Sequence, residues 1–176
     1  DEEQNDGGGG LTTDRTKLEH QRKIDIVLGP YWPCLIFVTF PLIIGLSLIT
    51  AFKAVFIPGQ ILLVQIFWTV SSVGLLFSLF EVGCRDPGIV HKYREKPSVL
   101  GNRFEEWNWN DKAQSFKPRG AIYDSDCAVV IDQFDHTCPW TGTAIGKKNM
   151  WAFQAFVGLV FICLPMDILL LASMTT

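Results

Sequence analysis

The apolar residues of this chain are concentrated in three long stretches. They run from Tyr31 to Phe52, from about Ile61 to Phe80, and from about Phe153 to Met174. A helix needs roughly 20 mostly apolar residues to cross a hydrocarbon core about 30 Å thick, and each stretch is long enough. The pattern therefore predicts three transmembrane helices.

Prolines and one acidic residue mark special positions in these stretches. Pro41 lies inside the first stretch and predicts a kink. Pro58 and Gly59 follow it and predict a reversal between two antiparallel helices. Asp167 lies inside the third stretch, where a carboxylate usually faces a bundle interior. A position near the far interface, with the side chain reaching water, is equally compatible with the sequence.

The polar segments complete the predicted organisation. We expect a flexible tail at 1–30, a transmembrane hairpin at 31–82, a polar loop domain at 83–150 and a third membrane helix at 151–176. Lys and Arg gather in the tail and the loop, whereas the short turn carries only Lys53, so the positive-inside rule places tail and loop in the cytoplasm. The expected fold class is an all-α polytopic membrane protein whose loop domain has little regular structure.

Charge and cysteine usage exclude two other classes. The formal net charge is −3, and the basic residues form no dense stripe, so a nucleic-acid partner is not expected. The five cysteines are an odd number, and several lie in or beside the apolar stretches. A disulfide scaffold is therefore a poor interpretation.

The loop carries one dense group of reactive side chains. Asp135, His136 and Cys138 lie within four positions, just before the third apolar stretch. His136 is a possible base for the Cys138 thiol, and Asp135 could orient the imidazole, which predicts a cysteine nucleophile. From spacing alone a structural interpretation stays open, in which Asp135 and His136 brace a turn and Cys138 is a small buried residue beside Trp140.

The surrounding segment, FDHTCPWTGTAIGKKN, resembles the core motif of the DHHC-type protein S-acyltransferases (palmitoyltransferases), F-D-H-H-C-P-W-V-G-N-C-I-G-x-x-N. The matching positions are Phe134, Asp135, His136, Cys138, Pro139, Trp140, Gly142, Ile145, Gly146 and Asn149. That family also carries an Asp-Pro-Gly triplet after its second membrane helix, and this chain has Asp86, Pro87 and Gly88 there.

The resemblance implies an acyl transfer in two steps. Cys138 would attack the thioester of a fatty acyl-CoA, palmitoyl-CoA above all, and pass the chain to a substrate cysteine, with His136 as base and Asp135 as its orienting partner. For the acyl-CoA itself we expect contacts from Lys147, Lys148 and Trp140. For the two lysines, a role as the positively charged cytoplasmic flank of the third span is equally compatible with the sequence. Because the family has four spans, we expect the chain to be a fragment that lacks the fourth.

The zinc scaffold of the family is degenerate here. Aligned with its Cys and His ligands are Asn110, Ala113, Tyr123, Asp124, Cys127, Val130, Thr137 and Ala144. A tetrahedral structural site needs four N or S ligands, and only Cys127 remains. His20 and His91 lie at no ligand spacing from a cysteine. We therefore predict no structural zinc, and a DHTC core in place of DHHC.

Two functions stay open at this point. The first is an active S-acyltransferase whose partners are the lipid bilayer and proteins with membrane-proximal cysteines. The second is a catalytically inactive, DHHC-like accessory subunit of a larger membrane complex. Both predict an integral protein of an intracellular or plasma membrane.

Overall fold

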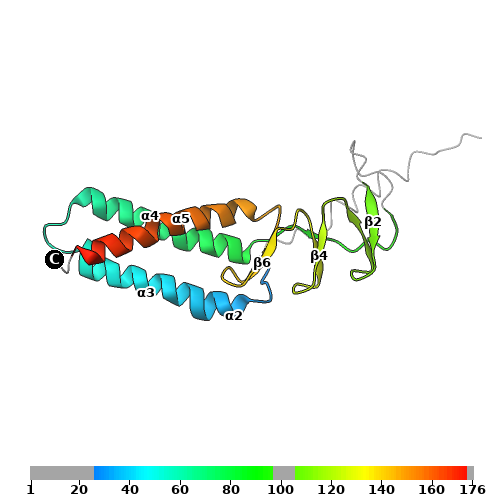
Figure 1. Cartoon of the computed structure of the whole chain (residues 1–176), viewed down its shortest axis with the longest axis horizontal. Helices are drawn as coiled ribbons and strands as arrows, with labels where there is room; N and C mark the ends of the chain where they lie inside the picture. The colour runs from blue at the N-terminus through cyan, green and yellow to red at the C-terminus, as the bar shows by residue number, and fades with distance from the viewer. Residues whose placement is uncertain (1–25, 97–105, 174–176) are drawn as a thin grey trace, which may run out of the picture.

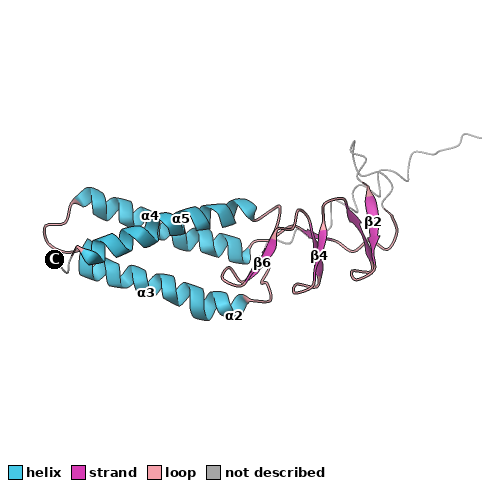
Figure 2. Cartoon of the chain, in the orientation of Figure 1, coloured by secondary structure: helices cyan, strands magenta, loops and turns pink. Residues whose placement is uncertain are grey.

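The computed structural model describes residues 26–96 and 106–173, so most of the predicted flexible tail lies outside the described residues. Long helices lie side by side in one half of the molecule, and small β-sheets follow one another away from the helix ends in the other half (Figure 1). The same division is visible by secondary structure in Figure 2. The helical half agrees with the predicted spans, whereas the β-sheets were not predicted.

The first span is continuous but changes its helical geometry twice. Its parts are α2 (Trp32–Cys34), a π-helical turn η1 (Leu35–Thr39), α3 (Phe40–Thr50) and a second π-helical turn η2 (Ala51–Val55). Pro41 has no N–H group, so it cannot continue the regular backbone ladder. A π-turn directly before this proline accommodates the missing donor.

Helices α4 (Leu62–Cys84) and α5 (Met150–Ala172) form the other two spans and pack against each other. All three spans are long and apolar enough to cross a membrane, as predicted. Large apolar side chains such as Phe52, Leu63 and Phe161 are exposed on their outer faces. Such surfaces suit lipid, since exposed apolar patches of this extent are unusual on soluble monomers.

The expectation of an all-α fold is wrong. The described residues between α4 and α5 form three small antiparallel sheets. Their strands are β1 (Ile89–Val90), β2 (Trp107–Asn110), β3 (Ser115–Pro118), β4 (Ile122–Asp124), β5 (Val129–Ile131), β6 (His136–Cys138) and β7 (Thr143–Ile145). The sheets are β1-β5-β4, β2-β3 and β6-β7.

The brevity of these strands explains why the pattern of apolar residues did not predict them. Each has only two to four residues, too few for a visible alternation of apolar and polar positions. Tight turns provide the pairing instead, and Gln114, Ala128 and Gln133 adopt the positive φ angles that such turns need. The β region is thus built from local backbone pairing and a small core.

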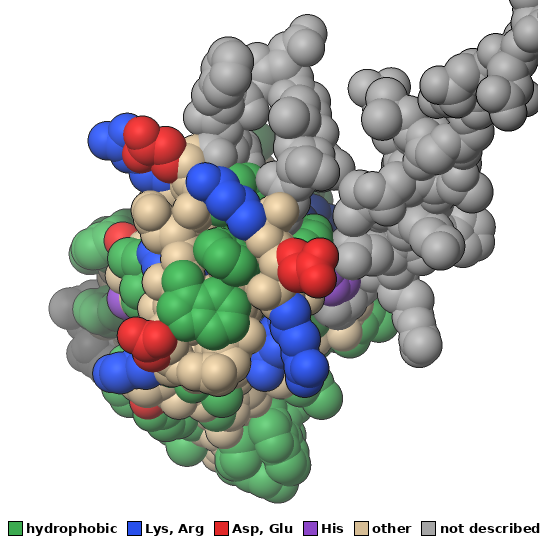
Figure 3. Space-filling view, turned by 90° about the vertical axis from the view of Figure 1, so that its right-hand side faces the viewer, with side chains coloured by type: hydrophobic (Ala, Val, Ile, Leu, Met, Phe, Trp, Pro, Cys, Tyr) green, Lys and Arg blue, Asp and Glu red, His purple; other side chains and the backbone are tan. Residues whose placement is uncertain are grey.

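Charges of both signs share the surface at the β end of the molecule. Lys and Arg side chains lie among Asp and Glu side chains there (Figure 3). One such pair is Arg119 with Glu106, 3.7 Å apart and well exposed. A mixed surface of this kind does not form the single-sign patch that characterises nucleic-acid binding.

Candidate active site

The β6-β7 hairpin positions the reactive residues of the loop. In its register His136 lies opposite Ile145, and Cys138 lies opposite Thr143. Alternate residues of a strand point to the same face, so the His136 and Cys138 side chains share one face of the hairpin. The turn of the hairpin contains Gly142 at φ +77, where a Cβ atom would also lie 2.9 Å from Cβ of Leu35. A larger residue would therefore push the hairpin away from the first span.

The imidazole of His136 is oriented by its neighbours on two sides. Its Nδ1 lies 2.9 Å from Oδ2 of Asp135, and its ring meets the Phe153 ring edge-on, with centroids 5.1 Å apart. Both His136 and Asp135 are about half exposed. Because Asp135 engages Nδ1, Nε2 is the nitrogen left to act as a base.

Cys138 is a buried free thiol between the hairpin and the helices. It is 8% exposed and belongs to the main core cluster with Leu35, Leu79 and Phe156. His136 shares its strand face, while Cys138 itself packs among apolar helix side chains. The structure thus pairs Asp135 with His136 and places Cys138 two residues further along the same short strand.

An apolar cavity of about 390 Å³ begins at Cys138 and runs between the helices. Its wall consists mostly of side chains from α3 and α5, together with Leu75 of α4. Trp140 lies at the same end as Cys138 and is 58% exposed. The only polar side chains in the wall are Thr39, Ser47 and Asp167. The thiol thus opens onto a long apolar space inside the membrane-spanning bundle.

Asp167 lies deep in this cavity. It follows Phe153 by 14 residues on α5, a rise of about 21 Å along the helix. Its carboxylate is 3% exposed and accepts a hydrogen bond of 2.7 Å from Trp68 Nε1. Of the two positions that the sequence left open, the structure has the inward one, and the cavity therefore ends on a polar group.

The Asp-Pro-Gly triplet packs directly beneath the hairpin. Oδ1 of Asp86 accepts hydrogen bonds from the backbone N–H groups of Gly88 and Ile89, at 2.9 and 2.8 Å. A Cβ atom on Gly146 would lie 2.6 Å from the Pro87 carbonyl oxygen. The two motifs are therefore in contact, and glycine is needed at position 146 because the chains approach so closely.

Burial alone would raise the pKa of Asp86, but hydrogen bonds from Ile89, Lys148 and Gly88 and the Lys148 charge lower it below its usual value. Lys148 Nζ lies 2.5 Å from Oδ2 of Asp86, and Lys147 Nζ lies 2.8 Å from Oδ2 of Asp132. Both lysines stay more than half exposed. The residues expected to meet CoA phosphates are thus already paired with carboxylates.

Asn149 is a site residue whose role the sequence did not indicate beyond the motif match. Its side chain is fully buried, donates to the Ala144 carbonyl at 2.9 Å and accepts from the Gly146 N–H at 2.9 Å. It thereby fixes the end of the hairpin to the first turn of α5. The sequence also does not predict Thr39, in the cavity wall, as a site residue, because a single threonine in an apolar stretch indicates no function by itself.

The positions aligned with the family's zinc ligands still come together as two sets. In the first set Asn110 accepts a hydrogen bond of 2.8 Å from the Ala113 N–H, Tyr123 pairs with Val130 across the sheet, and Ala113 and Val130 form a small apolar core with Ala121. These side chains offer no group of N and S donors. Apolar packing, rather than a donor group, brings these positions together.

The second set contains Asp124, Cys127, Thr137 and Ala144. Asp124 Oδ2 accepts a hydrogen bond of 2.8 Å from the Cys127 N–H, and Thr137 pairs with Ala144 in the hairpin. Burial, and then the hydrogen bond and charge of Asp124, raise the pKa of the Cys127 thiol to about 12. A protonated thiol is a poor metal ligand. Among residues 26–96 and 106–173, no group of three His, Cys, Asp or Glu side chains could hold a metal ion.

The carboxylate of Asp124 is the polar centre of this second set. Burial would raise its pKa, but the side chain and the N–H of Cys127 lower it below its usual value. The Thr137 hydroxyl is near enough to favour the charged form, although it lies outside the geometry of a proper hydrogen bond. The donor set therefore does not fit a tetrahedral zinc site.

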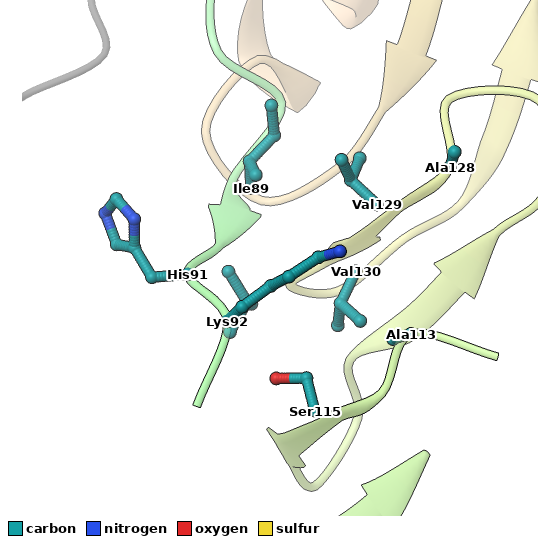
Figure 4. A pocket seen from close by; sticks show the side chains of 9 residues that line it. Ile89, His91, Lys92, Ala113, Ser115, Ala128, Val129 and Val130 are labelled. Carbon is teal, nitrogen blue, oxygen red and sulfur yellow. The ribbon is translucent and has the colours of Figure 1, made fainter. Parts of the chain in front are cut away.

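A smaller cavity of about 200 Å³ lies in the β region, away from Cys138. Valines and alanines from β1, β5 and the neighbouring turns form most of its wall, and Lys92 extends along it (Figure 4). The ring of His91 points away from the other labelled side chains (Figure 4). His91 therefore assembles no ligand group at this cavity.

The fold and the site together define a protein with three helices long and apolar enough to cross a membrane, and with a thiol at one end of the cavity between them. Residues 103–176 match the family model described as DHHC palmitoyltransferase. The chain is 33% identical over 64 residues to the palmitoyltransferase ZDHHC9 of Pongo abelii, covering 36% of this chain and 18% of that protein. These matches show similarity to DHHC palmitoyltransferases in the part of the chain that contains the β6-β7 hairpin and α5.

Two further relatives extend the similarity over more of the chain. A putative ZDHHC-type palmitoyltransferase 1 of Dictyostelium discoideum is 26% identical, with 56% of this chain and 25% of that protein covered. The palmitoyltransferase ZDHHC18-A of Danio rerio is 24% identical, with 66% of this chain and 32% of that protein covered. The chain spans a third or less of the length of these relatives.

Proposed function

We propose that this protein is a protein S-acyltransferase that works through an acyl-Cys138 intermediate. The observation that carries the proposal is the position of the Cys138 thiol at one end of the apolar cavity between α3 and α5. An acyl chain bound to Cys138 has a continuous apolar space to enter, and its burial there contributes about 0.8 kcal/mol per methylene group. On a water-exposed protein surface, an acyl chain linked to a thiol would have no comparable apolar space to enter.

In the first step the Cys138 sulfur attacks the carbonyl carbon of an acyl-CoA thioester. The new carbon–sulfur bond forms, the bond to CoA breaks, and CoA leaves as its thiol after taking up the proton that Cys138 lost. His136 Nε2 carries that proton between the two sulfurs, since Asp135 engages the other nitrogen. In the second step the sulfur of a substrate cysteine attacks the acyl-enzyme, and Cys138 is regenerated as a thiol.

The exposed groups around the mouth of the cavity suit the remaining parts of the substrates. Trp140 lies beside Cys138 and would cover the first carbons of the chain. Lys147 and Lys148 lie two and three residues after Ile145 of the hairpin, and their exposed ammonium groups could share CoA phosphates with their carboxylate partners. Protein substrates would present cysteines close to the membrane, where Cys138 lies.

The experiment is thioester labelling of the protein in lipid nanodiscs with an alkyne-bearing palmitoyl-CoA. We expect label that hydroxylamine removes, and we expect Cys138→Ser to abolish it. His136→Ala should slow labelling by about 10²–10⁴-fold, the usual contribution of a positioned base, and Asp135→Ala should slow it less. Cys34→Ser serves as the matched control, because Cys34 is a second thiol at the same end of the bundle, outside the cavity wall.

A second function, a catalytically inactive accessory subunit, is favoured by one observation, the replacement of the zinc ligand positions by packed and hydrogen-bonded side chains. If the wild-type protein takes no label while a zinc-bearing family member does so under the same conditions, the accessory function replaces the enzymatic one. Labelling that survives in Cys138→Ser but disappears in Cys84→Ser would identify the chain as an acylation substrate.

A further inference from the structure

The hydroxyl groups of the membrane helices are mostly satisfied by their own backbone. Thr50, Thr69 and Ser71 each donate to the carbonyl oxygen four residues earlier, at 3.1, 2.7 and 2.8 Å. This is the usual solution for a hydroxyl inside a helix. Thr39 differs, because its residue is only 5% exposed and its Oγ1 has no hydrogen-bond partner.

Thr39 is the last residue of the π-helical turn η1. The carbonyl four residues before it belongs to Leu35, and this oxygen accepts the backbone N–H of Phe40 in the wide π-turn. Pro41 follows directly and supplies no N–H of its own. Thr39 therefore lies in an irregular part of the helix backbone, and its hydroxyl makes no hydrogen bond. Such π-turns occur frequently at functional sites.

Thr39 lies in the wall of the cavity that begins at Cys138. It is one turn after Leu35, which belongs to the same core cluster as Cys138 and is close to Gly142 of the hairpin turn. It precedes Ser47, another member of the wall, by eight residues, which is about 12 Å along the helix. The unpartnered hydroxyl is thus at the Cys138 end of the cavity.

We propose that the Thr39 hydroxyl donates a hydrogen bond to the carbonyl oxygen of the acyl group on Cys138. This inference rests on the proposed S-acyltransferase function. Apart from its sulfur, the carbonyl oxygen is the only hydrogen-bond acceptor that a saturated acyl thioester carries, and it is covalently held next to the Cys138 sulfur. An unpartnered buried donor in an otherwise apolar wall is costly unless a ligand satisfies it.

The same hydrogen bond would assist the reaction. Negative charge grows on the carbonyl oxygen when sulfur attacks the carbonyl carbon, and a donor placed in advance in a dry site stabilises that charge. Thr39 keeps its proton throughout, and no bond other than those of the acyl transfer is made or broken. Both steps pass through such an oxyanion, so both depend on Thr39.

The test compares Thr39→Val, which replaces the hydroxyl by a methyl group of similar size, with the wild-type protein in lipid nanodiscs. We expect the maximal rate of hydroxylamine-sensitive labelling to fall roughly 10²-fold, as for loss of one oxyanion donor, with little change in the palmitoyl-CoA concentration at half-maximal rate. Thr39→Ser keeps a hydroxyl and should retain most of the rate. Ser72→Ala is the matched control, because Ser72 Oγ is also buried without a partner but lies outside the cavity wall.

A spectroscopic measurement separates this role from packing. In the infrared spectrum of the acyl-enzyme made with isotope-labelled carbonyl, the thioester band should lie at higher frequency in Thr39→Val than in wild type, because the hydrogen bond is lost. Equal rates and equal bands in Thr39→Val and wild type would overturn the inference and leave the proposed function intact. An equal loss of rate in Ser72→Ala would overturn it as well. Absence of label in the wild-type protein would instead refute the proposed function itself.

Discussion

Nζ of Lys148 lies 2.5 Å from Oδ2 of Asp86, so an ion pair joins residues that are 62 positions apart in the chain. The Asp86 side chain is 6% exposed, whereas the Lys148 side chain is 58% exposed. The pair connects the segment after α4 with the segment before α5. It fixes the distance between the two membrane helices where the hairpin emerges.

We expect Lys148→Met to lower the free energy of unfolding by about 1–2 kcal/mol, since Asp86 would lose a charge-assisted hydrogen bond but keep its two backbone donors. Thermal unfolding in detergent measures the effect. Lys147→Met is the control, because Lys147 pairs with the more exposed Asp132 and should change stability less. Unchanged stability together with weaker acyl-CoA binding in Lys148→Met would instead assign Lys148 mainly to the CoA phosphates.

The Asp86 contacts also predict how stability depends on pH. Because the pKa of Asp86 in the folded protein is lower than its usual value, the contribution of this carboxylate is complete above about pH 4, the unfolded pKa, and is lost as the pH falls through the lower folded pKa. Unfolding temperatures measured between neutral and acid pH should therefore fall on the acid side. Asp86→Asn should reduce that dependence, and an unchanged slope in this variant would contradict the assignment.

The membrane helices were predictable because their signal is large. The apolar run from Tyr31 to Phe52 is long enough to predict a membrane-spanning helix, and the structure has a helix of that kind at Trp32–Val55. The third span begins at Met150, three residues before the predicted Phe153, because Asn149 fixes the preceding chain and the helix starts at once. Hydropathy measures length well, but it does not locate the residue that starts a helix.

The sequence predicted only those site residues that are close neighbours along the chain. Asp135, His136 and Cys138 are neighbours in the sequence, and the last two lie in one short strand. Thr39 and Asp167 come from two different helices and meet the site only through the cavity that the bundle forms. A sequence pattern cannot show that the Thr39 hydroxyl is buried without a partner, since this depends on how the helices pack.

The replaced zinc positions predict a β region whose stability does not depend on metal. We expect chelators to leave the unfolding temperature unchanged and elemental analysis to find less than one zinc per chain. Asp124→Ala should destabilise the region by about 1–3 kcal/mol, because the Cys127 N–H would lose its acceptor in a buried site. Ser125→Ala, at a neighbouring exposed position, is the control. Stoichiometric zinc, or a chelator-induced loss of stability, would show that the ligand alignment is wrong.

The last prediction concerns the deep end of the cavity, where the Asp167 carboxylate bonds to Trp68 Nε1 at 2.7 Å. We expect an acyl chain to end before this polar pair. Methylene groups packed against the Asp167 carboxylate would disrupt its hydrogen bond with Trp68, and no other contact would offset that cost in free energy. Asp167→Ala removes that end and leaves space for further carbons. We expect it to shift the preference from palmitoyl-CoA toward stearoyl-CoA by about tenfold, since two more buried methylene groups contribute about 1.6 kcal/mol.

Competition between the two acyl-CoAs, read by mass spectrometry of the Cys138 peptide, measures this shift in preference. Ser47→Ala, which changes a polar residue of the wall nearer to Cys138, should leave the ratio close to that of wild type. Trp68→Phe is the second variant, because it frees the carboxylate without enlarging the cavity at position 167, and it should not favour the longer chain. If Asp167→Ala is folded and labelled but keeps the wild-type ratio, the chain ends before Asp167 and this residue does not set its length.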